Sequence, residues 1–552
     1  MSKQKSQTYV FGAVILMLSN VLVKVIGAVF KIPLTNTIGV DGMAYFNAAY
    51  SIYVSLYMIS TAGLPVAISR MVAASNSRGN LKEVDRIFTI AFRLFVAIGV
   101  TGTVVMIAFS RSFATFSKLT DSYLAMIAIA PTLFFICLSS AVRGYFQGLQ
   151  NMVPTAVSNI IEAVGKLGIG LLSAWYFYIV KQYDLPLVAA FVISGVTIGV
   201  LGATVYIYIV KARYHASSEY KERLAAASTD MPVRPWQSLL RELVVTAIPI
   251  VLASSIMGLT NTIDTFIMAR RLVEAGITEA AAGSFYGTYS SMVVPLFNMI
   301  PPLIYPFAIG IIPALSAAIA AGKKEEGAGQ MESAFRMASI IAFPCAIGMG
   351  VLSENIISFL YRTETIDTGA YSVTTLTLAS EALSVISCSI FFLGIIAITN
   401  SILQAYRYER KTILSTTTGI VVKLIVTYIL SGIPGIGILG SAIGTALCYL
   451  TIMCMNLYFV IRYTGFVPHI RRVFLKPLIS GILCGVVAWA LAYLLSGHLP
   501  AKLVTLVSIA GAALVYVVTL LFIKGINRAE VLMLPKGDKI CGLLEKHGWL
   551  GK

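Results

Sequence analysis

The sequence predicts an all-α integral membrane protein with about fourteen transmembrane helices. Of its 552 residues, 58% are hydrophobic and only 12% are charged, which leaves too little polar surface for a soluble globular protein of this length. Apolar runs of membrane-spanning length recur along the whole chain. The basic residues behind the net charge of +17 gather between alternate runs. This pattern indicates membrane topology rather than a nucleic-acid-binding surface.

Fourteen runs are long and apolar enough to cross a bilayer. If charges at the ends of the runs are counted with the adjoining loops, the N-terminal side holds 29 Lys and Arg and the opposite side holds 8. The remaining four, Lys24, Arg93, Lys166 and Lys423, lie inside runs. By the positive-inside rule, both termini are predicted to be cytoplasmic. The runs cover residues 9–32, 42–69, 88–109, 122–145, 153–179, 185–210, 243–269, 283–320, 337–360, 374–402, 412–431, 436–461, 475–496 and 501–523.

The segments outside the runs are short. The first run is too long for a signal-peptide core and has no small-residue cleavage site after it, so we expect a retained helix. The basic stretch 211–242 reads as a cytoplasmic linker, and 524–552 as an amphipathic tail on the inner leaflet. The seven cysteines show no CxxC spacing and the four histidines form no cluster, so the pattern predicts no metal site.

An internal repeat organises the chain. The segment FQGLQNMVPTAVSNIIEAVGKL (146–167) aligns without a gap with LQAYRYERKTILSTTTGIVVKL (403–424), and the matches include polar positions inside apolar helices. We therefore predict an N-terminal bundle of helices 1–6 (1–210), a linker (211–242), a homologous bundle of helices 7–12 (243–465), two appended helices (466–523) and the tail (524–552). Two such bundles are expected to enclose a central cavity that opens to one side at a time.

Two helices contain candidate hinges. Helix 2 carries Gly63 and Pro65, and helix 8 carries five prolines, among them Pro301 and Pro302. Each proline removes a backbone donor and bends its helix. The same residues could equally form static kinks that only improve packing, and the sequence leaves both readings open.

Helix 1 carries a polar stripe within SNVLVKVIGAVFKIPL (19–34). Asn20, Lys24 and Lys31 fall on one helical face, and Lys24 lies about 22 Å along the helix from Tyr9. A charge at membrane depth costs roughly 2.5–3.5 kcal/mol, so this face should meet protein or water rather than lipid. Two ammonium groups favour an anion such as a phosphate. The alternative for Lys31 is that it extends to the outer interface.

Helices 5 and 11 repeat this theme. Glu162 and Lys166 share a face of helix 5 at i,i+4 spacing, where they could form a structural ion pair. Helix 11 has Gly419 at the position that corresponds to Glu162, so it supplies no acid one turn before Lys423. We predict Lys166 and Lys423 as further anion-binding residues.

Intramembrane acids are candidates for ion coupling. Asp264 on helix 7, Glu162 and Glu381 could carry a coupling cation, either Na⁺ or H⁺, and no other cofactor is expected. Asp264 is also a candidate partner for Lys423, with Glu381 and Glu354 as further candidates. No nucleophile elbow, P-loop or zinc signature occurs in the chain, so we do not expect an enzyme.

Three stretches carry a family resemblance: RGYFQGLQNMVPTAVSNIIEAVGK (143–166), PVAISRMVA (65–73) and GILGSAIGTALCY (437–449). They resemble the polysaccharide-biosynthesis branch of the multidrug/oligosaccharidyl-lipid/polysaccharide exporter (MOP) superfamily, which also holds the MATE-type exporters. The resemblance is greatest to the stage V sporulation protein B type, which is related to the MurJ/MviN lipid II flippases. Lys24 matches the first arginine of the R-x-x-G-x-x-R pattern that MurJ-type proteins carry on helix 1. Phe30 stands at the second position, with Lys31 one place later.

The resemblance implies a function. The chain would be a flippase in a bacterial plasma membrane that moves undecaprenyl-pyrophosphate-linked peptidoglycan precursor to the outer leaflet, a task in cell-wall synthesis and cell shape or in sporulation. Its partners would be this glycan lipid and membrane lipids, with cell-wall synthesis enzymes as further candidates and no nucleic acid. The chain would act as a monomer. The alternatives are export of another lipid-linked oligosaccharide or polysaccharide, and cation-coupled multidrug export. A non-transporting membrane scaffold that recruits cell-wall enzymes is a further alternative, and it would need no buried charges facing a cavity.

Overall fold

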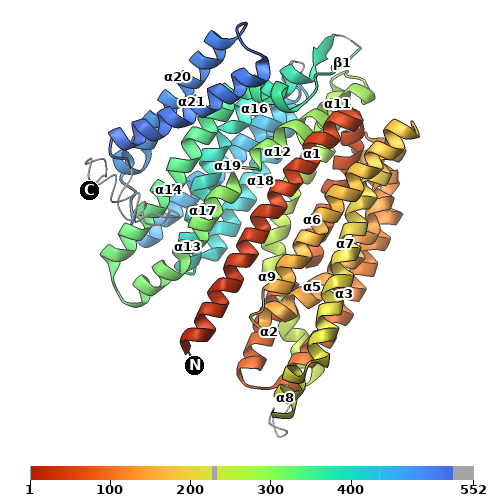
Figure 1. The fold of residues 1–552 in the computed structure, drawn as a ribbon, viewed down its shortest axis with the longest axis vertical. Helices are drawn as coiled ribbons and strands as arrows, with labels where there is room; N and C mark the ends of the chain where they lie inside the picture. Colours follow the sequence, from red (N-terminus) through yellow and green to blue (C-terminus); the bar gives the residue numbers. More distant parts are fainter. Residues whose placement is uncertain (1, 62, 227–232, 370, 434, 526–552) are drawn as a thin grey trace. The chain divides into compact units, whose positions relative to one another are not determined.

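The computed structural model describes residues 2–61, 63–226, 233–369, 371–433 and 435–525, and most of them lie in α-helices (Figure 1). Helices satisfy their own backbone hydrogen bonds, which the bilayer interior requires of apolar segments. Within these ranges, twelve helical segments are long and apolar enough to cross a membrane. The predicted fold class, an all-α multi-pass membrane protein, is confirmed. The predicted tail lies outside the described residues beyond Gly525.

One of the twelve segments, Ser19–Ser77, contains two of the predicted helices. The helix α1 (Ser2–Thr61) is interrupted at Gly39, whose φ of 69° and ψ of 177° are not helical. Lys31 Nζ lies 2.9 Å from Asn47 Oδ1, although sixteen residues of straight helix would span about 24 Å. The chain therefore folds back at Gly39 into a hairpin, as the predicted separation of helices 1 and 2 requires.

The internal contacts of the chain divide it into two units, Met1–Ser291 and Met292–Lys552. This boundary falls inside predicted helix 8, so predicted helix 7 belongs to the first unit. The repeat places helix 7 in the second bundle, and this assignment stays a prediction. The six-plus-six repeat with two appended helices stays a prediction.

The first unit contains eleven α-helices among its described residues. Helices α3, α5, α6 and α7 lie side by side, and α1 packs against α5, α6, α7, α9 and α11 (Figure 1). A π-helical turn follows α6 (Trp175–Val180), and another follows α9 (Asp264–Met268). The helices are α1, α2 (Leu64–Ser77), α3 (Leu81–Ala108), α4 (Ser110–Phe116), α5 (Tyr123–Gly148), α6 (Val153–Ala174), α7 (Leu185–Ala216), α8 (Ser218–Ala226), α9 (Trp236–Ile263), α10 (Ala269–Glu274) and α11 (Glu279–Thr288).

Two apolar clusters form the core of the first unit. One joins the α1 hairpin to α5 and α7 around the fully buried Phe30 and Phe46, whose ring centroids are 5.9 Å apart. The other joins α2, α3, α5 and α9 through residues such as Phe95, Tyr145 and Leu243. Together they hold the α1 hairpin in place against the bundle.

The second unit is also helical and carries one small hairpin, in which β1 (Thr365–Asp367) pairs antiparallel with β2 (Ser372–Thr374), Ile366 opposite Val373. Helices α20 and α21 run beside each other and share an apolar cluster with α15 (Figure 1). The helices are α12 (Val294–Phe297), α13 (Pro301–Ala320), α14 (Lys324–Val351), α15 (Ser353–Leu360), α16 (Thr375–Ser387), α17 (Ser389–Ala405), α18 (Glu409–Leu430), α19 (Leu439–Thr464), α20 (Lys476–Leu495) and α21 (Ala501–Phe522).

The two predicted hinge regions differ in their backbone structure. The run 283–320 is divided into α11, a π-helical turn, α12 and α13, with three non-helical residues before Pro301. Gly63 lies between α1 and α2, and a Cβ atom there would come within 2.4 Å of the Ala247 carbonyl oxygen of α9. Glycine at this position therefore permits close backbone packing of α2 on α9. Whether either position acts as a hinge stays a prediction.

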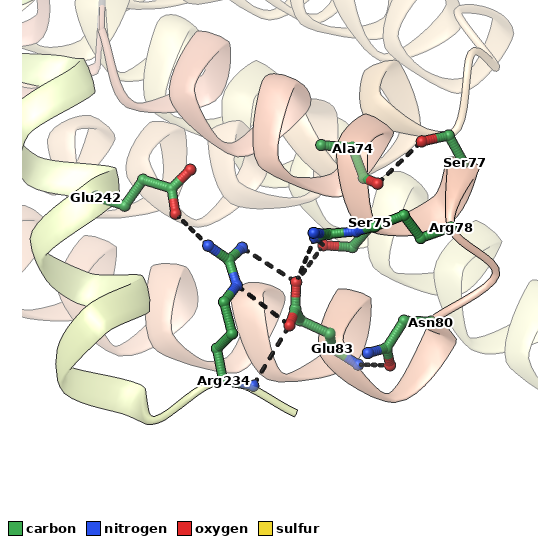
Figure 2. Close-up of polar contacts among 8 residues, drawn as sticks. All are labelled: Ala74, Ser75, Ser77, Arg78, Asn80, Glu83, Arg234 and Glu242. Atoms are coloured by element: carbon green, nitrogen blue, oxygen red, sulfur yellow. Dashed lines mark hydrogen bonds and ion pairs between the residues drawn. The ribbon is translucent and has the colours of Figure 1, made fainter. Parts of the chain in front are cut away.

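The predicted linker is anchored to the start of α3 by a buried carboxylate (Figure 2). The Glu83 side chain is 2% exposed, and Arg234 donates to it from Nη2 (3.0 Å), Nε (3.2 Å) and the backbone N–H (3.3 Å). Ser75 Oγ (2.6 Å) and Arg78 Nη2 (3.0 Å) also donate to Glu83. Arg234 further pairs with Glu242 of α9 at 2.6 Å. The residues just before α9 are thus bound to both α2 and α3.

A second acid on the same turn binds the other end of the linker. The Tyr220 hydroxyl of α8 donates to Asp85, and His215 Nε2 lies 3.9 Å from Asp85 Oδ1. The ring of His215 stacks on that of Tyr220 with 4.4 Å between centroids. Both described flanks of the linker are therefore attached to the first turn of α3.

Replacing Gly63 with Ala should destabilise the protein by about 1–3 kcal/mol, because the new methyl group overpacks the contact with Ala247. The melting temperature of the purified protein in detergent measures this effect. Gly27→Ala is the matched control, since no atom lies within 4 Å of a Cβ at Gly27. Equal melting temperatures for the two variants would contradict the packing role of Gly63.

Arg234→Ala should cost about 1–3 kcal/mol, because it removes the two hydrogen bonds that the guanidinium donates to the buried Glu83 carboxylate. Arg78→Ala should cost less, since Arg78 is 55% exposed and donates to Glu83 only once. Thermal melting of both variants provides the comparison. An Arg78→Ala loss as large as that of Arg234→Ala would argue against this ranking.

Candidate functional site

Helices α1 and α6 lie against each other along the polar face that the sequence predicts. Ser19 Oγ donates to the Ala156 carbonyl oxygen at 2.9 Å, and Asn159 Nδ2 donates to Asn20 Oδ1 at 3.4 Å. Further along, Phe30 lies against Gly170, where an added Cβ would meet its ring at 2.7 Å. These contacts progress in the same direction along both helices, so the polar residues of α1 and α6 form one continuous face.

Lys24 lies on this face between the contacts of Asn20 and Phe30. Its side chain is exposed, as is that of Asn20. Within the described part of the chain, Lys24 makes no hydrogen bond or ion pair that would neutralise its charge. An exposed ammonium inside a membrane-spanning helix is tolerable where water or a polar ligand reaches it. That this face meets protein or water rather than lipid stays a prediction.

Lys31 lies seven residues, or about 10 Å, further along α1. Its ammonium donates to Asn47 Oδ1 at 2.9 Å and to the Ser290 carbonyl oxygen at 3.3 Å. Asn47 in turn donates to Ser291 Oγ at 2.7 Å. These partners are uncharged, so they hold the Lys31 ammonium in place and leave its positive charge available to an anion.

Lys166 is held by aromatic rings. Its ammonium lies 4.4 Å from the centroid of the Tyr50 ring and 5.1 Å from that of Phe30. The negative faces of the rings attract the ammonium without cancelling its charge. Lys166 is half-buried, like Lys31, and both lie in the first unit.

The ion pair predicted between Glu162 and Lys166 is replaced by a different one. Glu162 Oε2 accepts from Arg143 Nη2 of α5 at 3.1 Å, while Arg143 Nε donates to Ser158 Oγ at 3.1 Å. Arg143 lies at the end of the apolar run 122–145, where its charge counts with the adjoining loop and nothing in the sequence marks it as a site residue. A cation on a neighbouring helix can compete with the i,i+4 partner of an acid. The sequence does not show this competition, because it depends on how α5 packs on α6.

The four cations Arg143, Lys24, Lys166 and Lys31 are here called the cationic stripe. They lie on α5, α6 and the first arm of the α1 hairpin, in one structural unit. Only Arg143 has a carboxylate partner among the interactions described above. The stripe therefore carries an excess of positive charge within membrane-spanning segments, which is suited to binding an anionic group.

Asp264, the predicted coupling residue, begins the π-helical turn after α9. It is 7% exposed. The neighbouring Thr265 hydroxyl lies 2.6 Å from Ser51 Oγ and 2.9 Å from the Tyr286 hydroxyl. No three His, Cys, Asp or Glu side chains among the residues described come close enough to hold a metal ion. The hydroxyls of Ser51, Thr265 and Tyr286 thus form a hydrogen-bonded group beside Asp264 in the chain.

The predicted residues of the second unit differ in exposure. Lys423 on α18 is 1% exposed, so its ammonium is enclosed within the unit. Glu381 on α16 and Glu354 on α15 are exposed. Gly419 has a packing role, because a Cβ there would meet Ile452 Cγ1 at 2.4 Å and the Cys448 carbonyl oxygen at 2.9 Å.

Comparisons with known proteins agree with this architecture. Residues 10–319 match the family described as polysaccharide biosynthesis protein. Over 529 residues the chain is 25% identical to the lipid II flippase MurJ of Bacillus subtilis (strain 168), covering 92% of this chain and 93% of the relative. Over 531 residues it is 22% identical to stage V sporulation protein B of the same organism, covering 96% and 98%.

Solved structures of transporters share the fold. A structure of lipid II flippase MurJ in an inward closed conformation superimposes with a TM-score of 0.62 at 14% identity, covering 92% of this chain and 98% of that one. An inward-facing multidrug resistance MATE transporter of the MOP superfamily gives a TM-score of 0.61 at 14% identity, covering 82% and 98%. The predicted resemblance is confirmed: this chain belongs to the polysaccharide biosynthesis protein family and has the fold of the MOP superfamily transporters.

Proposed function

We propose that this protein is a flippase that moves the undecaprenyl-pyrophosphate-linked peptidoglycan precursor, lipid II, from the inner to the outer leaflet by alternating access. It would work in a bacterial plasma membrane with both termini in the cytoplasm. The observation that carries the proposal is the exposed Lys24 at the centre of the cationic stripe. A diphosphate presents several anionic oxygens, which multiple ammonium and guanidinium groups recognise well.

The spacing of the stripe supports movement of the anion along it. Lys24 and Lys31 are about 10 Å apart along α1 at 1.5 Å per residue, so a diphosphate leaving one of them enters the field of the other. The relatives named as a lipid II flippase and a sporulation protein support a lipid-linked cell-wall substrate. The description of the family favours the second candidate, another lipid-linked glycan.

Lys24→Ala should abolish transport without affecting membrane insertion, because it removes the exposed charge from the stripe. The assay uses a bacterium depleted of its own lipid II flippase and measures lipid II at the outer leaflet. The wild-type chain should restore this exposure, and Lys24→Arg should retain much of it because the positive charge remains. Lys502→Ala, an exposed lysine at the start of α21, is the control.

Full lipid II exposure in the Lys24→Ala variant would contradict the anion-site assignment. No exposure with the wild-type chain, despite normal membrane expression, would redirect the assignment to another lipid-linked glycan or to drug export. Equal loss in Lys24→Ala and Lys502→Ala would indicate a general effect of charge removal rather than a specific site.

We further propose Asp264 as the residue that couples transport to a cation, Na⁺ or H⁺. Its burial and the hydroxyl groups around Thr265 support this role, since hard cations prefer oxygen ligands. Asp264→Asn should reduce lipid II exposure at least tenfold and make the remainder insensitive to the cation gradient. Spheroplasts with imposed Na⁺ or pH gradients provide the measurement, and an unchanged gradient response would refute the assignment.

A further inference from the structure

The two residues of the Arg143–Glu162 pair are held to different degrees. Arg143 is 11% exposed and is fixed by a second hydrogen bond, from Nε to Ser158 Oγ at 3.1 Å. Ser158 is itself fully buried and donates to the Thr155 carbonyl oxygen at 2.8 Å. Glu162 is 31% exposed and bonds to Arg143 through Oε2. The guanidinium is therefore the fixed partner, and the carboxylate is the one free to move.

A second cation lies within reach of the Glu162 carboxylate. Lys166 is four residues further along α6, the spacing at which Glu and Lys side chains meet on a helix. In this structure its ammonium lies over Tyr50 and Phe30 instead, a weaker interaction than an ion pair in a partly buried site. A carboxylate that leaves Arg143 can thus turn to Lys166 by rotation of its own side chain.

We propose that Glu162 acts as an internal substitute for the substrate anion and alternates between Arg143 and Lys166. The inference rests on the proposed function and concerns the regulation of the same site. The diphosphate of the lipid-linked substrate displaces Glu162 from Arg143, because it offers more negative charge and more acceptor oxygens to the guanidinium. The displaced carboxylate pairs with Lys166, so Glu162 is not left without a cationic partner.

The exchange of Glu162 between Arg143 and Lys166 gives the movement of the diphosphate along the stripe a direction. While Glu162 is on Arg143, Lys166 is available to an anion, and while Glu162 is on Lys166, Arg143 is available. When the diphosphate advances along α6 to Lys166, the carboxylate returns to Arg143 and blocks the way back. One acid therefore prevents two neighbouring cations from holding the substrate at the same time.

The test compares binding with transport in the full-length chain. Binding is measured as the apparent Kd of the purified protein in lipid nanodiscs for undecaprenyl pyrophosphate, and transport as lipid II exposure in the flippase-depleted bacterium. Glu162→Gln removes the competing charge and should tighten binding about tenfold, which corresponds to about 1.4 kcal/mol. The same variant should transport at least tenfold less, because the bound anion is no longer released from Arg143.

Further variants keep the outcome interpretable. Arg143→Gln should weaken binding about tenfold, and Glu162→Asp, with its shorter side chain, should tighten it less than Glu162→Gln. Glu274→Gln is the matched control, since Glu274 pairs with Arg270 and Arg271 on α10, away from the stripe. Inorganic pyrophosphate titrated alone should give the same order of variants with weaker binding, which separates recognition of the diphosphate from that of the lipid.

The outcomes distinguish the inference from the function on which it rests. If wild type binds undecaprenyl pyrophosphate and Lys24→Ala weakens this binding, but Glu162→Gln weakens it too or leaves it unchanged, then Glu162 is a structural partner of Arg143 and the inference is overturned. If wild type does not bind the diphosphate lipid at all, both the proposed function and the inference fall. Glu162→Asp supplies the decisive comparison if Glu162→Gln does not fold.

Discussion

The cost of placing charge in hydrocarbon governs the arrangement of the first unit. The four cations of the cationic stripe meet this cost in different ways. Arg143 pairs with a carboxylate, and the Lys166 ammonium lies over two aromatic rings. Lys31 donates to an amide oxygen and a carbonyl oxygen, whereas Lys24 is exposed. Only one of these solutions cancels the charge. The packing of the α1 hairpin against α5 and α6 therefore preserves a line of positive charge that isolated helices could not keep in a membrane.

Hydropathy and charge bias were sufficient to predict most of the fold. The apolar runs correspond to helices because the bilayer leaves the backbone no other way to satisfy its hydrogen bonds. The π-helical turns, the break before Pro301 and the attachment of α9 to the first unit were not predictable. They depend on contacts between distant segments, such as Arg234 with Glu83 and Gly63 with Ala247, that leave no periodic signal in the sequence.

The candidate site was predicted in part, and for a specific physical reason. Lysines and acids in apolar helices are conspicuous, so Lys24, Lys166 and Glu162 could be identified from sequence alone. Their partners could not, since helix periodicity relates residues on one helix but says nothing about the neighbouring one. The i,i+4 spacing therefore indicated Lys166 as the partner of Glu162. In the structure, the Glu162 carboxylate pairs with Arg143 of α5 instead. The position on α18 that corresponds to Glu162 is Gly419, and the reason also lies in packing between helices. In the second unit, α19 lies so close to α18 that a side chain at Gly419 would clash.

The turn at Gly39 has a consequence for how the protein enters the membrane. Helices that are joined by a single non-helical residue emerge from the ribosome one directly after the other, ahead of the later helices. The contact between Lys31 and Asn47 lies entirely within this pair, so the ammonium has a polar partner as soon as both arms are inserted. A positively charged first helix, unfavourable for insertion by itself, can thus be integrated together with the segment that solvates it.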